Sequence, residues 1–508
     1  MDIVSVEQMK AIESKANAGG LSYDQMMRNA GEGIANWICQ NVNPEKGVVG
    51  LIGSGNNGGD TIIALTKLAS LGFRSLGFLL NKRQDDPLLA DFVEAGGALV
   101  ELFHNENIAL FQAALTPKII ILDGILGTGI RLPIRGELKK LMGSLHDILE
   151  DRTDIHIIAV DCPSGLDCDT GEVSEVSFMA NDTLYMAAVK QGLLVPPGRI
   201  YAGDLSSIDI GIRNISEISI DALPMIIDKK YCEKILPERP GDGHKWTFGT
   251  CLVIAGSRSY TGAAYLTGKA AYRSGCGLVH MVSIDSVQEA LAGKLVEAVW
   301  STIPGKNSQY DPAGINLLKG VLEKADAIVI GPGWGLGDLN LQFLSGLLES
   351  LPQTLPTLFD ADALKLLGKI SEWWKRVPEN SLLTPHPGEL SALTGLSISE
   401  IQSNRWKITQ KFAMQWGVTL LLKGAVPVIS TQEGQLLIHP VCDSILATAG
   451  SGDVLSGLIG GFLAQSLSVS KAAALGTCIQ AKTAQILKSR PNKGTATALD
   501  ILDLLTFE

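Results

Sequence analysis

The sequence predicts an α/β fold in which two domains are each built around a largely parallel sheet. Its 508 residues exceed one domain of about 150 residues. Apolar runs alternate with helical segments along almost all of the chain, which is typical of βαβ units. The alternation pauses only between about residues 213 and 243. We therefore expect one domain over residues 1–220, doubly wound and Rossmann-like, and a second α/β domain over residues 221–508.

The elements of the first domain follow from apolar runs and their flanking signals. Ser5, with Gln8 three residues later, fits a capping box and starts the first helix. A glycine loop follows the first strand, and a helix is expected from about Thr61 to Leu71. The buried strands of this domain are predicted at residues 48–52, 75–80, 118–122, 156–160, 183–187 and 205–210.

Residues 237–243, rich in proline and glycine, are the best candidate for the linker between the domains. After them the alternation restarts, with strands predicted at residues 249–255, 277–284, 325–330, 356–359, 381–383 and 418–422. Residues 454–470 carry no charge and barely reach the length of about 17 residues that can span a bilayer. Because they include glycines, serines and a glutamine, we interpret them as a buried helix.

Composition excludes several classes of protein. Apolar residues make up 46% of the chain and charged residues 19%, which excludes a disordered protein. The net charge of −11 argues against a nucleic-acid partner. None of the eight cysteines has the C-x-x-C spacing of a zinc or redox site, and the start lacks a signal peptide. We expect reduced thiols, no membrane association and a cytoplasmic protein.

Polar side chains follow three strands of the first domain. Gly53-Ser54-Gly55-Asn56-Asn57-Gly58-Gly59-Asp60 follows one strand, Asp123 the next, and Asp161 with Ser164 a third. Ligands of a doubly wound sheet bind beyond the carboxyl ends of its strands, so Asn57, Asp123, Asp161 and Ser164 should converge. An oxygen-only ligand set suits a weakly held hard cation. The alternatives are a tight turn without a ligand and aspartates that only cap helices.

The segments GSGNNGGD, LDGILGTGIR, AVDCPSGLD and LYMAAVKQGLL resemble the N-terminal domain of the YjeF family, the NAD(P)H-hydrate epimerases. The similarity covers roughly residues 1–215. It implies potassium on Asn57, Asp123 and Ser164, and Asp161 as a catalytic carboxyl. Lys190 near a strand end either assists or is a solvated lysine. The implied hydrate contacts are Asn56, Asn57, Gly58, Gly59, Asp60, Gly127, Thr128, Gly129, Ile130, Arg131, Leu132, Pro133 and Asp161.

In the second half, Gly450-Ser451-Gly452-Asp453 precedes the long uncharged helix. Glycines let backbone N–H groups point at one spot, and a helix N-terminus adds positive potential there. An aspartate at that mouth is placed to act as a base on a hydroxyl beside a bound phosphate. This arrangement resembles the ribokinase-like fold.

The motifs AGSRSYTGA, GPGWG, DAD, LTPHPGE and LKGA then occur in the order of the YjeF C-terminal domain, the ADP-dependent NAD(P)H-hydrate dehydratases. The match covers about residues 230–505, with Cys478 where a histidine-glycine pair is common. It implies Asp453 as the base and Mg²⁺ with ADP. The implied nucleotide contacts are Lys423, Gly424, Ala425, Val426, Pro427, Gly450, Ser451 and Gly452. The implied hydrate contacts are Ala263, Gly333, His386 and Asp453.

Together these resemblances imply bifunctional repair of NADHX and NADPHX, the hydrates of NADH and NADPH. The R and S hydrates would be epimerised, and the S hydrate dehydrated with ADP to AMP, phosphate and NAD(P)H. A homo-oligomer is expected. His386 could instead be structural, and Asp360 and Asp362 could either cap a helix or order Mg²⁺ through water. The rival functions are a ribokinase-like small-molecule kinase with a fused nucleotide-binding regulatory domain, and a nucleotide-sensing scaffold without activity.

Overall fold

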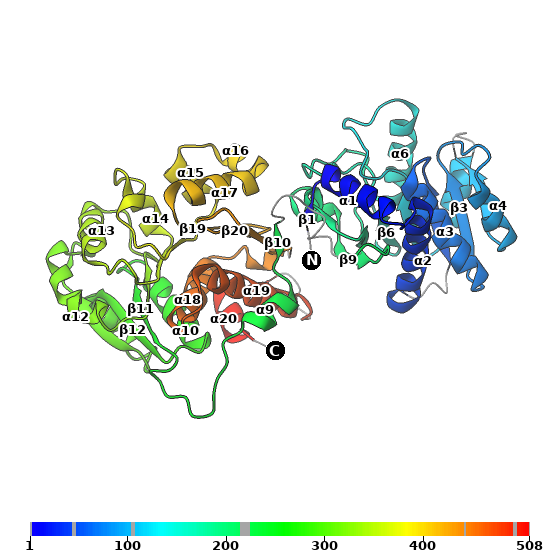
Figure 1. The fold of residues 1–508 in the computed structure, drawn as a ribbon. Helices are drawn as coiled ribbons and strands as arrows, with labels where there is room; N and C mark the ends of the chain where they lie inside the picture. The colour runs from blue at the N-terminus through cyan, green and yellow to red at the C-terminus, as the bar shows by residue number, and fades with distance from the viewer. Residues whose placement is uncertain are drawn as a thin grey trace. The chain divides into compact units, whose positions relative to one another are not determined.

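The computed structural model describes residues 3–42, 47–102, 107–213, 224–440, 443–490 and 495–506. The chain separates into two compact units, Met1–Pro224 and Met225–Glu508 (Figure 1). Both are α/β, as expected. The expected boundary between residues 220 and 221 lies outside the described residues.

The first unit contains a seven-stranded sheet in which every pairing is parallel. In spatial order its strands are β4 (Ala98–Glu101), β3 (Ser75–Leu79), β2 (Val48–Ile52), β5 (Ile120–Gly124), β6 (His156–Val160), β7 (Asp182–Met186) and β9 (Asp204–Ile208). A separate parallel pair joins β1 (Ile3–Val4) to β8 (Val189–Lys190). The helices are α1 (Val6–Ala18), α2 (Tyr23–Asn41), α3 (Asn56–Ser70), α4 (Pro87–Glu94), α5 (Ile108–Ala114), α6 (Gly136–Leu149), η3 (Gln191–Leu194) and α7 (Gly198–Tyr201).

This sheet is covered on both faces. Ile120 and Leu122 belong to one buried cluster, whereas Ile119 and Ile121 belong to another. Alternate residues of a strand point to opposite faces, so each cluster lies on one side of the sheet. Strands buried on both sides consist of continuous apolar residues, which explains why the five inner strands β2, β3, β5, β6 and β7 could be predicted. The edge strand β9 was predicted as well, although it is partly exposed. All six predictions are confirmed to within two residues.

The second unit contains a ten-stranded sheet. In spatial order its strands are β10 (Met225–Ile226), β21 (Leu436–Ile438), β20 (Val428–Ser430), β19 (Thr419–Leu422), β18 (Ser381–Leu383), β17 (Thr357–Phe359), β16 (Ala327–Ile330), β11 (Thr250–Ile254), β12 (Leu278–Ile284) and β13 (Val299–Ile303). Strand β20 is antiparallel to both of its neighbours, and the other pairings are parallel. A small hairpin pairs β14 (Gly305–Lys306) with β15 (Gln309–Tyr310).

Helices cover both sides of this second sheet. Figure 1 shows α15, α16 and α17 on one side of β19 and β20, with α18 and α19 on the other. The helices are α9 (Lys229–Ile235), α10 (Thr261–Arg273), α11 (Asp285–Leu291), η4 (Pro312–Leu318), α12 (Lys319–Leu322), α13 (Asp338–Ser350), α14 (Asp362–Leu367), η5 (Trp373–Lys375), α15 (Pro387–Thr394), α16 (Ile398–Ser403), α17 (Arg405–Trp416), η6 (Ser444–Leu446), α18 (Ser451–Ala464), α19 (Val469–Lys488) and α20 (Ala498–Asp503). Helix α18 packs on β11 and β16, which brings its first turn to the carboxyl ends of the central strands.

Three local expectations are corrected. Residues 237–243 do not link the units, because β10 and α9 precede them and already belong to the second unit. Helix α3 begins at Asn56 rather than near Thr61, since the paired glycines fit its first turn. The uncharged stretch is a buried helix only as far as Ala464, where α18 ends, and Ser466 with a φ of 66° separates α18 from α19. Among the described helices, none is long and apolar enough to cross a membrane.

Candidate active sites

In the first unit, Asp161 and Lys190 form a buried ion pair. Asp161 follows β6 in a left-handed conformation with a φ of 64°, which turns its carboxylate toward the end of the neighbouring strand. Its Oδ1 accepts hydrogen bonds from Lys190 Nζ and from the Met186 backbone N–H. Lys190 is 1% exposed, so its interpretation as a solvated lysine is wrong.

Two further carboxyl groups face this pair. Burial, reinforced by the charges of Asp161 and Glu13, raises the pKa of Asp60 well above its usual value. Burial also raises the pKa of Glu13 on α1, although Lys190 opposes this shift. Burial alone would lower the pKa of Lys190, but its contact with Asp161 produces a net rise. The site therefore combines a charged pair with a carboxyl group, Asp60, that favours its protonated form.

The three predicted cation ligands converge beside this pair. Ser164 Oγ donates a 2.5 Å hydrogen bond to Asp123 Oδ1, and the Ser164 backbone N–H donates to Asp123 Oδ2 at 2.8 Å. Asn57 Nδ2 lies 2.5 Å from the Val160 carbonyl oxygen and 3.3 Å from that of Leu126. Burial raises the pKa of Asp123 to about 6, although its hydrogen bonds from Ser164 oppose the rise.

The glycines around Asn57 are required by close contacts. A Cβ on Gly58 would lie 2.1 Å from the Gly53 carbonyl oxygen, and one on Gly127 would lie 2.5 Å from Asn57 Oδ1. Arg83, after β3, donates to the carbonyl oxygens of Gly53 at 2.7 Å and Gly55 at 3.0 Å. Arg83 thus fixes the start of α3. No motif in the sequence marks this role, and only the position of Arg83 after a strand could have indicated it.

The remaining predicted hydrate contacts divide into two groups. Asn56 is exposed at the start of α3, whereas Asn57, Gly58, Gly59 and Asp60 are buried. The segment of residues 127–133 follows β5, and its later part borders an open cavity of about 530 Å³. The lining residues of this cavity include Gly129, Ile130, Arg131, Leu132 and Pro133.

In the second unit, the predicted glycine loop forms the start of α18. Gly450 is its N-cap with a φ of 89°, and no side chain caps the helix. Asp453 lies in the first turn. Burial and the nearby Asp360 charge raise the pKa of Asp453 to about 7, although Lys423 opposes the rise. The helix therefore presents a partly positive N-terminus together with a carboxyl group that titrates near neutral pH.

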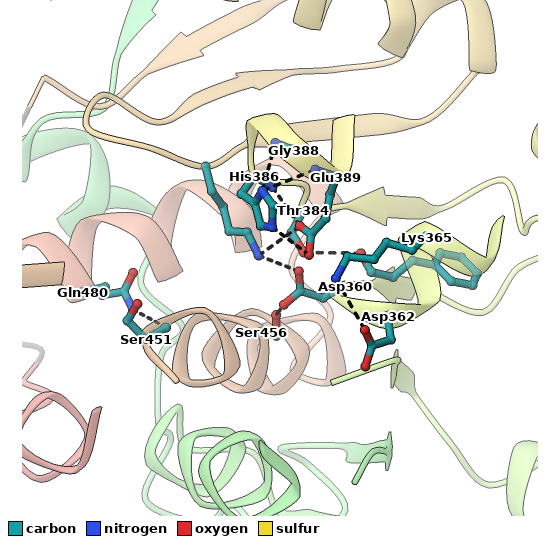
Figure 2. A network of polar contacts seen from close by, with 12 residues as sticks. Asp360, Asp362, Lys365, Thr384, His386, Gly388, Glu389, Ser451, Ser456 and Gln480 are labelled. Carbon is teal, nitrogen blue, oxygen red and sulfur yellow. Dashed lines mark hydrogen bonds and ion pairs between the residues drawn. The ribbon is translucent and has the colours of Figure 1, made fainter. Parts of the chain in front are cut away.

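Lys423 lies beside the glycine loop and contacts the carboxylates of Asp360 and Glu389. It follows β19, and its Nζ lies 2.6 Å from Asp360 Oδ1 and 3.9 Å from Glu389 Oε2. Ser456 Oγ on α18 donates to Asp360 Oδ2 at 2.6 Å, and Figure 2 shows Asp360 between this helix and Glu389. A Cβ on Gly452 would lie 3.4 Å from Lys423 Nζ. The lysine and the glycine loop, predicted as nucleotide contacts, are therefore adjacent.

His386 and the two aspartates of the DAD motif have structural partners. His386 is the N-cap of α15, and its Nδ1 accepts from the backbone N–H groups of Gly388 and Glu389 (Figure 2). Neither Asp360 nor Asp362 caps α14, whose N-cap is Ala361 without a side-chain hydrogen bond. The capping interpretation of those aspartates is therefore wrong. Asp362 Oδ2 instead accepts from the Gly335 backbone N–H at 2.8 Å.

Two residues that the sequence analysis missed support the predicted nucleotide contacts. Arg405, on α17 and 4% exposed, donates from Nη2 to the carbonyl oxygens of Leu422, Lys423 and Val426 at 3.0–3.2 Å. Burial lowers the pKa of its guanidinium to about 10. Gln480 on α19 donates to the Ser451 carbonyl oxygen at 2.7 Å. No local motif marks either residue, because their contacts join distant segments.

The last two predicted contacts, Ala263 and Gly333, lie against each other. A Cβ on Gly333, which has a φ of 67°, would lie 2.7 Å from Ala263 Cβ. A side chain at position 333 would therefore displace the start of α10. On the same helix, Leu266 packs 2.6 Å from where a Cβ of Gly450 would stand, so α10 connects this contact to the glycine loop at the start of α18.

Sequence comparisons agree with this division into two sites. Residues 23–192 match the family described as YjeF-related protein N-terminus, and residues 251–506 match NAD(P)H-hydrate dehydratase. The bifunctional NAD(P)H-hydrate repair enzyme of Moorella thermoacetica is 33% identical over 90% of this chain and 86% of its own length. That of Salinibacter ruber is 31% identical over 96% and 92%.

Among solved structures, the ADP/ATP-dependent NAD(P)H-hydrate dehydratase of Bacillus subtilis matches 56% of this chain and 97% of its own, with 27% identity and a TM-score of 0.47. The two relatives, in contrast, align along nearly the whole chain, across both of its units. The chain therefore belongs to the family of bifunctional NAD(P)H-hydrate repair enzymes.

Proposed function

We propose that the first unit interconverts the R and S hydrates of NADH and NADPH, and that the second unit dehydrates the S hydrate with ADP. The products are AMP, phosphate and the reduced nicotinamide cofactor. The observation that carries the proposal is the presence of two independent acid–base sites. Asp161 with Lys190 lies at strand ends of one sheet, and Asp453 with Lys423 at strand ends of the other.

Epimerisation requires only proton transfer and a held water. The hydrate carries its hydroxyl beside the ring nitrogen, whose lone pair can expel it and leave a planar iminium that water attacks from either face. The pair of Asp161 and Lys190 gives a proton to the departing oxygen and takes one from the incoming water. Asp60, which favours its protonated form, is a second proton source in the same site. General acid–base catalysis of this kind contributes roughly 10²–10⁴ in rate.

The residues of the first unit fit a bound potassium ion. Asp123 is 1% exposed, and no lysine, arginine or histidine in the described part of the chain forms an ion pair with it. A buried carboxylate without a cationic partner is costly. Asn57, Asp123 and Ser164 would hold the ion, and hard oxygen donors suit it. Bound there, potassium supplies positive charge near the site of proton transfer.

Dehydration in the second unit requires a better leaving group than hydroxide. Asp453 takes the proton from the hydroxyl group of the hydrate. The oxygen of this hydroxyl group attacks the β-phosphorus of ADP, and AMP departs. Phosphate then leaves with the help of the ring nitrogen. The first turn of α18 and Lys423 surround the transferred phosphoryl group, which helix N-termini and lysines stabilise.

Asp360 and Asp362 are the residues that would hold the Mg²⁺ bound with ADP. Asp360 already contacts Lys423 and Ser456, and Asp362 accepts from Gly335. Neither carboxylate is without a partner. We therefore infer that Asp360 and Asp362 would hold Mg²⁺ through water, since Mg²⁺ keeps several waters and binds nucleotides largely through their phosphates. Bound there, it would neutralise phosphate charge.

The proposal is tested by incubating the protein with a mixture of both hydrate epimers, with and without ADP. With ADP, reduced-nicotinamide absorbance should recover completely, with one AMP and one phosphate per cofactor. Without ADP, the epimers should exchange on a chiral column and no absorbance should return. ATP-dependent phosphorylation of a vitamin or sugar, with no turnover of the hydrates, would favour the kinase interpretation instead.

A further inference from the structure

A second cluster of reactive side chains lies in the second unit, apart from the residues assigned to dehydration. Cys232 on α9 and Cys478 on α19 line one cavity of about 420 Å³, together with His439 and Lys482. The two helices pack against each other. Cys232 is 7% exposed, Cys478 is partly exposed, and both thiols are free.

The two thiols have opposite electrostatic environments. The hydrogen bond from Cys232, together with His439 and Lys482 and against the opposing effect of burial, lowers the pKa of Cys478 to about 5. The same hydrogen bond, burial and the nearby Asp228 and Glu233 raise the pKa of Cys232. At neutral pH the pair is therefore one thiolate beside one protonated thiol. Thiolates are the nucleophilic form of cysteine.

The first unit contains a second pair of neighbouring thiols, which is buried. Cys162 and Cys168 also form a hydrogen-bonded pair of thiols, but each is 1% exposed. The hydrogen bond with Cys168 and burial raise the pKa of Cys162 well above its usual value. This pair has no access to solvent comparable to that of Cys478. Proximity of two thiols is therefore not what distinguishes the cluster on α9 and α19.

We propose that Cys478 and Cys232 are a peroxide-reactive dithiol in which Cys478 is oxidised first and Cys232 then closes a disulfide. The Cys478 sulfur attacks one oxygen of a hydroperoxide, an S–O bond forms as the O–O bond breaks, and the departing oxygen is protonated. The Cys232 sulfur next attacks the Cys478 sulfur, the S–O bond breaks, and water leaves with the thiol proton. Two thiols lose two electrons, and hydrogen peroxide becomes two waters.

The proposed bond would join α9 to the helix that positions the phosphate loop. Gln480 lies two residues after Cys478 on α19, and its side chain donates to the Ser451 carbonyl oxygen. Reduction by a small dithiol would restore the starting state, because disulfides exchange with thiolates.

The test is oxidation of the reduced full-length protein by hydrogen peroxide, followed by alkylation of the remaining thiols and peptide mapping by mass spectrometry. The main product should be a Cys232–Cys478 disulfide, while Cys162 and Cys168 remain reduced. The rate of Cys478 oxidation should change less than about twofold between about pH 6 and pH 8, whereas that of free cysteine rises about tenfold per unit there.

Variants separate the two chemical steps. In Cys232→Ser, Cys478 should accumulate as a sulfenic acid that dimedone traps, and in Cys478→Ser the fast reaction should be lost. Cys39→Ser, which removes an exposed thiol of the first unit, is the matched control and should behave as wild type. A Cys478 that stays reduced, a disulfide to any other cysteine, or a rate that rises with pH as for free cysteine would overturn the proposal.

Discussion

Replacing Asp453 by asparagine tests the dehydratase mechanism, because the substitution should slow dehydration and yet stabilise the second unit at alkaline pH. The change keeps the shape of the side chain and removes the base. Dehydration should slow by roughly 10²–10⁴. The affinity for ADP should change little, because the loop presents Gly450, Ser451 and Gly452 through backbone groups that the substitution leaves in place.

The same substitution should stabilise the second unit at alkaline pH. The pKa of Asp453 rises from 3.8 to about 7 on folding, and each unit is worth about 1.4 kcal/mol. The shift of about 3 units corresponds to about 4 kcal/mol, which partial exposure reduces to about 2 kcal/mol. Because the folded state holds the proton more tightly, the contribution of Asp453 to stability is fully present below about pH 4 and is lost as pH rises through about 7. The variant lacks this loss.

The assays are AMP release, ADP affinity by calorimetry, and denaturant unfolding at about pH 5 and pH 8. Wild-type kcat/KM for the S hydrate should rise with pH to a plateau above about 7, since the base must be ionised. Near wild-type dehydration by the variant would show that Asp453 is not the base. A collapse of ADP binding would show that it maintains the loop. Equal pH dependence of stability in both proteins would refute the assigned environment.

Three further perturbations probe the supporting residues. Lys190→Met should destabilise the first unit by about 3–5 kcal/mol at neutral pH, because it leaves Asp161 buried without its partner. Denaturant unfolding measures this loss, and an unchanged unfolding midpoint would contradict the pairing. Arg405→Lys should raise the KM for ADP about tenfold while changing kcat less, because the ammonium lacks the planar guanidinium whose Nη2 contacts the three carbonyl oxygens while Nη1 donates to Gln402. Steady-state kinetics decide, and an unchanged KM would exclude a positioning role. Removal of potassium should slow epimer exchange by the wild type, whereas Asp123→Asn, which lacks a potassium ligand, should exchange epimers at the same rate with and without the ion. Chromatography of the epimers measures the rates, and equal wild-type rates in potassium-free and potassium buffers would exclude the ion.

The central strands could be predicted because burial on both faces makes them continuous apolar runs. Strand β4 was missed for the converse reason. It lies at the edge of the sheet, and both of its end residues are exposed, so its pattern is weak. The interpretation of residues 237–243 as a linker failed because β10 has only two residues and pairs with β21, about 210 positions later. Local composition contains no signal for such a pairing.

The residues of the candidate sites also fall into those that the sequence could indicate and those that it could not. Residues within contiguous motifs, such as Asn57 and Asp453, could be recognised from the sequence because a glycine loop after a strand has a limited set of uses. Arg405 could not, because its contacts join α17 to the end of β19 through the tertiary fold. Lys190 was noticed at a strand end, but only burial beside Asp161 distinguishes it from a surface lysine.

Complementation between two inactive variants decides whether the chain carries two independent catalytic sites. Asp161→Asn and Asp453→Asn are each incubated with an equal mixture of hydrate epimers and ADP, separately and then together. Asp161→Asn alone should rapidly recover only the S half of the cofactor, and Asp453→Asn alone should recover almost none. The mixture of variants should recover all of it at a rate close to that of wild type, because each protein supplies the site that the other lacks. Failure of the mixture to exceed Asp161→Asn alone, with both variants folded, would contradict two independent sites.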